Sequence, residues 1–112
     1  MRTTFTLLTL IFLTTQCKAE TFSVGVMGAG AVSCATWLST PTSELQGESW
    51  ILGFWTGSNW VALTYGAKRN VGYSTDNLGI IAEVKKRCLN SPSQTVELVV
   101  AGLINEFFKA GK

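Results

Sequence analysis

Two cysteines, Cys34 and Cys88, remain in the part of this 112-residue chain that follows its N-terminal leader. The leader predicts export to an oxidising compartment, where a pair of cysteines forms a disulfide bond. The two residues lie 54 positions apart, and closing a loop of that length stabilises a domain by about 4 kcal/mol. A two-cysteine zinc site is the alternative, but the chain has no histidine to complete the ligand set. The cysteines therefore predict a small disulfide-stapled domain that works outside the cytoplasm.

The first 19 residues have the three-part layout of a secretory signal peptide. Arg2 gives a positive start, residues 5–13 are a short apolar run, and the polar residues after it end in Ala19. The apolar run is too short to span a bilayer. We therefore expect a signal peptide at 1–19, a single domain at 20–112 and a periplasmic location.

Lipidation at Cys17 is the alternative to simple cleavage. Gln16 stands before this cysteine, where lipoprotein signals carry a small residue. No later stretch holds about 18 uninterrupted apolar residues, so we expect no integral membrane span in either case.

The leader also carries two of the nine basic residues, Arg2 and Lys18. Its removal leaves seven basic side chains against seven acidic ones. Nucleic acid binding needs a clustered positive surface. We therefore expect no nucleic acid partner.

The pattern after the leader predicts a mainly α domain. Residues 21–33 are expected to form a short extended arm that ends in a glycine-rich turn, and residues 34–38 a short helical turn. A helix is predicted over 44–64, with Ser43 and Gln46 as its capping box.

Two further helices are predicted towards the C-terminus. The first begins near Thr75 or Asp76. Its buried stripe is Leu78, Ile81, Val84 and Cys88. The second is capped by Ser91, has Pro92 at its first position and runs to about Lys109. Its inner face is Val96, Val99, Val100, Leu103, Ile104 and Phe107. The fold expected is a compact single-domain bundle of three to four helices with a short extended N-terminal arm and one disulfide.

The residue types present argue against catalysis. The absence of histidine removes Ser–His and Cys–His nucleophile pairs and most catalytic metal sites. The cysteines are not spaced as C-x-x-C, so a thioredoxin-type role is not predicted. Glu44 and Glu48 share a helix face and could act as a carboxylate pair, although such a pair near a helix start is more often a solvated face. We expect no enzyme activity, no cofactor and no metal site.

The aromatic residues are the candidates for partner binding. Trp37 and Trp50 are expected in the core. Trp55, Trp60 and Tyr65 spread too widely around one helix to face a single direction, so we take these three as candidate partner-binding residues. The alternative is that they pack against neighbouring helices.

Two other features receive structural explanations. The Gly53-x-x-x-Gly57 spacing lets another backbone approach closely, and we expect that approach inside the domain. The basic run at 85–87 is expected to be a solvated face near a helix C-terminus.

Four segments together resemble a known group of proteins. They are residues 28–37 and 50–57, residues 76–81, and Cys88 with Pro92 four positions later. This order resembles small proteobacterial periplasmic proteins of HdeA-like build and the related Rap1a/Tai immunity proteins. The resemblance implies a compact helical domain, often dimeric, whose disulfide joins the start of the first helix to a later helix, here Cys34 to Cys88.

Three functions follow from these observations. The leading hypothesis is an exported, non-catalytic protein-binding domain in the periplasm, for example an immunity or inhibitor protein. Its partner would be another periplasmic protein, and a homodimer is a further expectation. The first alternative is an HdeA-like acid-stress chaperone. The second is a small cell-wall-active enzyme that uses Glu44 or Glu48.

Overall fold

A computed structural model describes residues 25–112. These residues form a 3-10 turn, η1 (Gly28–Ala31), and four α-helices. The helices are α1 (Cys34–Trp37), α2 (Pro41–Thr64), α3 (Asn77–Asn90) and α4 (Val96–Lys109). The prediction of a mainly α domain with one disulfide is confirmed. The leader, Cys17 and the first part of the predicted arm lie outside the described residues.

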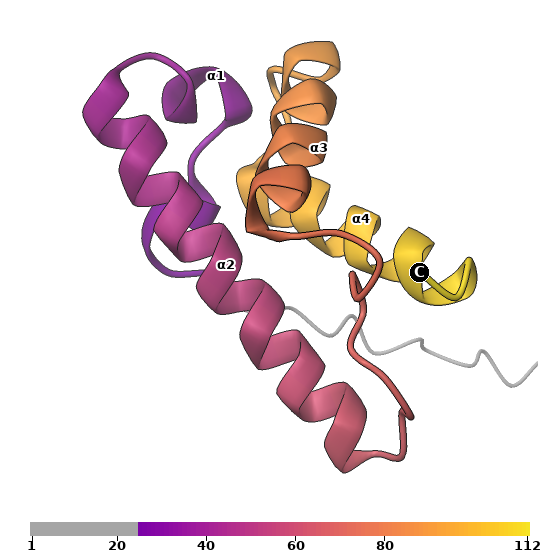
Figure 1. Cartoon of the computed structure of the whole chain (residues 1–112). Helices are drawn as coiled ribbons and strands as arrows, with labels where there is room; N and C mark the ends of the chain where they lie inside the picture. Colours follow the sequence, from indigo (N-terminus) through magenta and orange to yellow (C-terminus); the bar gives the residue numbers. More distant parts are fainter. Residues whose placement is uncertain (1–24) are drawn as a thin grey trace, which may run out of the picture.

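The described residues contain no strand, and their only bridge of β type pairs Ser33 with Thr95. The predicted arm is extended at Met27 and then closes into η1. In Figure 1, α2 is the long diagonal helix, and α3 and α4 lie on one side of its upper half. The lower half of α2 continues past them, and the chain between α2 and α3 runs back from its end.

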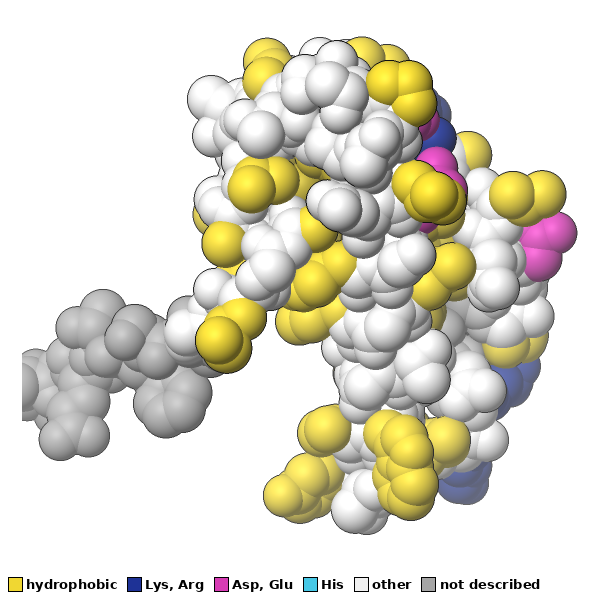
Figure 2. Space-filling model, turned by 90° about the vertical axis from the view of Figure 1, so that its left-hand side faces the viewer, with side chains coloured by type: hydrophobic (Ala, Val, Ile, Leu, Met, Phe, Trp, Pro, Cys, Tyr) yellow, Lys and Arg dark blue, Asp and Glu magenta, His cyan; other side chains and the backbone are white. Residues whose placement is uncertain are grey.

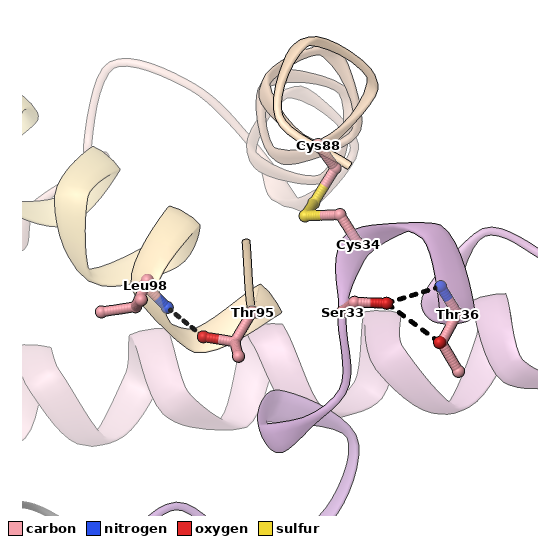
Figure 3. The surroundings of a disulfide bond; sticks show 6 residues. All are labelled: Ser33, Cys34, Thr36, Cys88, Thr95 and Leu98. Carbon is pink, nitrogen blue, oxygen red and sulfur yellow. Dashed lines mark hydrogen bonds between the residues drawn. A yellow bond between two sulfur atoms is a disulfide. The ribbon is translucent and has the colours of Figure 1, made fainter. Parts of the chain in front are cut away.

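The disulfide joins the first residue of α1 to the last part of α3 (Figure 3). Cys34 and Cys88 are fully buried, and their Cα atoms lie 5.0 Å apart. The Ser33 hydroxyl caps α1 by accepting a hydrogen bond from the Thr36 N–H at 3.1 Å. Since α1 has only four residues, it cannot hold its shape alone, and these links fix it against α3.

The start of α2 differs from the prediction. The helix begins at Pro41 rather than at Glu44, and its capping box consists of Thr40 and Ser43. The Thr40 hydroxyl accepts from the Ser43 N–H at 3.1 Å, and the Ser43 hydroxyl accepts from the Thr40 N–H at 3.2 Å. The predicted Ser43–Gln46 box was wrong because proline suits the first helical position, where no N–H is needed.

The start of α4 also differs, by four residues. Thr95 is the N-cap, and the predicted cap at Ser91 was wrong. The carbonyls of Pro92 and Gln94 accept hydrogen bonds from the N–H groups of Ala35 and Cys34, at 3.0 and 2.8 Å. A contact between segments far apart in the sequence therefore holds residues 92–94 out of the helix. The end of the helix at Lys109 is as predicted.

The core forms where α2, α3 and α4 meet. The predicted stripe of α4 is buried at Val96, Val99, Val100 and Leu103. On α3, Ile81, Val84 and Cys88 are buried as predicted, but Leu78 is 80% exposed. The buried face of α3 also includes Ile80, so it lies to one side of Leu78. The Trp55 and Phe107 rings meet edge to face at 5.8 Å and join α2 to α4.

Three tryptophans pack their rings on glycines. Trp37 lies on Gly47, Trp50 on Gly30 and Trp55 on Gly72, so closely at the first two that a methyl group there would overlap the ring. Each indole N–H also donates to a backbone carbonyl. The acceptors are Glu44 at 2.9 Å for Trp37, Met27 at 2.9 Å for Trp50 and Val71 at 2.7 Å for Trp55. The absence of a side chain on each of these glycines therefore lets a large ring pack directly on the backbone.

We predict that removing the disulfide costs much of the stability of the domain. Replacement of Cys34 and Cys88 by serine should lower the free energy of unfolding by about 4 kcal/mol, because the unfolded chain regains the entropy of an open loop. Urea denaturation measures the change. Reduced wild-type protein is the control and should match the variant; an unchanged midpoint in both would contradict the prediction.

Replacement of two glycines of α2 by alanine should change the stability of the domain in opposite directions. Gly47→Ala should lower the free energy of unfolding by about 1–3 kcal/mol, because the added methyl group meets the Trp37 ring. Gly53→Ala should raise it by up to about 1 kcal/mol, because nothing lies near that position and alanine is the better helix former. Thermal unfolding of both variants in dilute solution tests the pair, and a loss of stability in Gly53→Ala would contradict it.

Candidate protein-binding surface

The outer side of α2 carries no charged side chain over most of its length. From Ser49 to Ala67 the sequence contains no Asp, Glu, Lys or Arg. Figure 2 shows this side of the molecule: charged side chains lie along one edge, and hydrophobic side chains gather at the lower end of the helix. A surface helix of a globular domain normally places charged residues on its outer face. The outer side of α2 is therefore unusual for a surface in contact with water.

Gly53 and Gly57 lie on this outer side. Both are exposed, and no atom lies within 4 Å of where a Cβ would stand. The expectation that they provide close packing inside the domain is wrong, because the core contacts of α2 are made by Ile51 and Trp55 on the opposite side. Each glycine costs an exposed helix about 1 kcal/mol relative to alanine. Nothing within the described chain offsets that cost.

The hydroxyl groups along α2 are turned back onto the helix itself. Ser49, Thr56 and Thr64 each donate to the carbonyl four residues earlier, at 3.2, 2.8 and 2.8 Å. Ser58 does the same at 2.9 Å. The O–H donor of a hydroxyl bonded in this way needs no water as its acceptor. The outer side of α2 is thus able to lose its hydration at little cost.

The three candidate partner-binding residues have different environments. Trp55 is 4% exposed and belongs to the core, so it is not available on the surface. Trp60 is 72% exposed and Tyr65 is 87% exposed. Val61 and Leu63 are also exposed nearby. We call the exposed apolar residues Trp60, Val61, Leu63 and Tyr65 the apolar end of α2.

The apolar end projects from the body beyond a clamp at Asn59. The Asn59 side chain accepts from the Val71 N–H at 2.7 Å and donates to the Val71 carbonyl at 3.2 Å. Trp55 donates to the same carbonyl. These bonds hold the returning chain against α2. Two hollows flank the helix on either side of this level, one beside Trp60 and the other between Phe54 and Val61.

The carboxylates considered for catalysis form interhelical ion pairs. Lys85 on α3 contacts both Glu44 and Glu48 on α2, with 2.7 Å between the Lys85 Nζ and the Glu48 Oε1. Hydrogen bonds to Glu44 and then Glu48 raise the pKa of Lys85 above its ordinary value. Both glutamates thus tie α2 to α3.

The basic run at 85–87 is only partly solvated as predicted. Lys86 is exposed, but Lys85 and Arg87 are paired with acidic residues. The Arg87 Nη1 lies 2.8 Å from the Glu106 Oε2 and joins α3 to α4. The hydrogen bond from Arg87 holds the pKa of Glu106 below its ordinary value.

Residues 25–112 contain no cluster of potential metal ligands. In the same part of the chain, no helix has the length and apolar character needed to cross a membrane. No protein-family model, no curated protein and no solved structure matches the sequence or the fold. The relation to HdeA-like and Rap1a/Tai proteins therefore stays a prediction.

We predict that part of the stability lost in acid is due to protonation of Glu106. The pKa of Glu106 is lower in the folded state than in the unfolded state. Its ion pair with Arg87 therefore stabilises the fold fully above the ordinary glutamate pKa of about 4.3, and this stabilisation is lost as pH falls through the lower folded-state pKa. Thermal unfolding between about pH 2 and 7 measures the slope. Glu106→Gln should flatten it in the acid limb. Glu97→Gln, which changes the other acidic residue of α4, is the control and should keep the slope; equal slopes in wild type and Glu106→Gln would contradict the assignment.

Proposed function

We propose that the chain is an exported, non-catalytic domain that works in the periplasm and binds protein through the outer side and apolar end of α2. The observation that carries the proposal is the exposure of Trp60 and its apolar neighbours on a helix side without charge. Tryptophan and tyrosine are the residues that most often dominate the energy of protein interfaces. Monomeric proteins rarely expose a large contiguous apolar patch to water. Such a patch therefore indicates an interaction site.

The location is supported by the covalent structure. The bond between Cys34 and Cys88 suits an oxidising compartment and would be reduced in most cytosols. The signal-peptide pattern of residues 1–19 agrees with that compartment. An immunity or inhibitor protein fits this description, because such a protein needs a rigid scaffold and a contact surface rather than a reactive centre.

One set of contacts favours a second candidate function, the acid-stress chaperone. Glu44, Glu48 and Glu106 hold the three helices together through Lys85 and Arg87. Protonation of the carboxylates in acid would remove the ion pairs that join α3 to both neighbours, which would loosen the packing and expose apolar surface. Binding of a hydrophobic dye during an acid titration tests this candidate, and no increase in fluorescence down to pH 2 would remove it.

We predict that protein binding depends on Trp60 and Tyr65. Mature tagged protein incubated with periplasmic extract should retain a partner protein, and Trp60→Ala should weaken that retention by about thirtyfold, the loss typical of an interface hot spot. Tyr65→Ala should weaken it less. Leu89→Ala, which removes an equally exposed apolar side chain from α3, is the matched control. Retention that is unchanged in both aromatic variants would contradict the proposed surface.

A further inference from the structure

The fourth tryptophan differs from the other three. Trp37, Trp50 and Trp55 each rest on a glycine and donate their indole N–H to a carbonyl. Trp60 rests on no glycine and makes no side-chain hydrogen bond with a described residue. Conversely, Gly53 and Gly57 are the two glycines of α2 on which no ring packs. On α2 itself, one tryptophan ring is thus left without a glycine, and two glycines are left without a ring.

These three residues lie on one side of α2. Trp60 follows Gly57 by three positions and Gly53 by seven, and both spacings place residues on the same face of a helix. Within its own chain Trp60 packs on neither glycine, because no atom lies within 4 Å of where a Cβ would stand on Gly53 or Gly57. A second α2 helix lying antiparallel to the first can supply the missing contact.

We propose that the outer side of α2 binds a second copy of this chain, with Trp60 of each copy resting on Gly53 and Gly57 of the other. The inference rests on the proposed function, since it names the protein that this surface binds. A two-fold axis at the level of Thr56 and Gly57 lies midway between Gly53 and Trp60. Around that axis the same surface serves both copies, as an isologous interface requires.

The charge distribution suits contact with a second copy. Around a two-fold axis each residue near the centre meets its own equivalent, so a charged side chain there would repel itself. The contact side has no charged residue from Ser49 to Thr64, and its hydroxyls are already bonded within the helix. An anionic membrane surface would favour lysine and arginine among these residues instead.

The size of the contact sets the expected affinity. The charge-free part of α2 is about 24 Å long at 1.5 Å per residue. A pair of helices of that length buries less than the roughly 800 Å² per partner of a standard stable interface. We therefore expect a dimer with a dissociation constant in roughly the micromolar range.

Sedimentation equilibrium of the disulfide-bonded exported protein over roughly 1–300 µM brackets that range. Wild type should shift from monomer to dimer. Trp60→Ala should weaken the dimer by about thirtyfold. Gly57→Leu should also abolish it by filling the contact, yet it should raise the urea midpoint of unfolding because leucine is the better helix former. Opposite changes in association and stability separate a lost interface from a damaged fold, and Leu89→Ala should alter neither.

The orientation is tested by cross-linking. Trp60→benzoylphenylalanine, irradiated in solution, should give a covalent dimer whose adduct maps to residues 53–57 of the second copy. An adduct elsewhere in the second copy would overturn the antiparallel contact.

Three outcomes would overturn the inference as a whole. The first is a monomer over the entire concentration range, or a dimer that Trp60→Ala and Gly57→Leu leave intact. The second is a monomer whose capture of a different periplasmic protein depends on Trp60, in which case the protein-binding function stands and the second copy is excluded. The third is a monomer that sediments with phosphatidylglycerol vesicles through Trp60, which would assign the surface to lipid.

Discussion

The disulfide between Cys34 and Cys88 is the constraint on which the rest of the arrangement depends. It attaches a helix of one turn to α3, and the backbone of the same turn is bonded to residues 92 and 94 just before α4. Those bonds decide where α4 begins. The first turn, α3 and the start of α4 therefore form one linked unit, and α2 packs against it through the Trp37 ring and the ion pairs of Lys85.

Where α2 packs against the rest of the chain, glycine and tryptophan act as matched pairs. A ring that rests on backbone gains a large contact area, and its N–H is satisfied by a carbonyl close by. The arrangement occurs at three places that differ in local structure: a 3-10 turn, a helix and a loop. Its repetition is what makes Trp60 informative, because α2 also carries a tryptophan and two glycines that do not pack on each other.

Much of the fold was accessible from the sequence. The cysteine pair, the start of α3 near Thr75 or Asp76 and the valine stripe of α4 follow local rules, and each was predicted correctly. The start of α4 was not, because long-range hydrogen bonds override a good local cap. The side of α2 that faces the core was also inaccessible, since apolar residues occur all around this helix. The candidate surface was predicted at Trp60 and Tyr65 but missed at Gly53 and Gly57, although the long run without charge was a usable signal.

The Asn59 clamp on Val71 has a consequence for how such a domain can change over time. The clamp fastens the end of the packed part of α2 to Val71. Residues 60–70 lie beyond it and form a lobe whose side chains contribute little to the core. Substitutions in that lobe would change the exposed surface and remove few contacts of the core. If this lobe binds protein as proposed, recognition and stability depend on largely separate stretches of the chain, and a new binding preference could evolve by single substitutions that leave the fold intact.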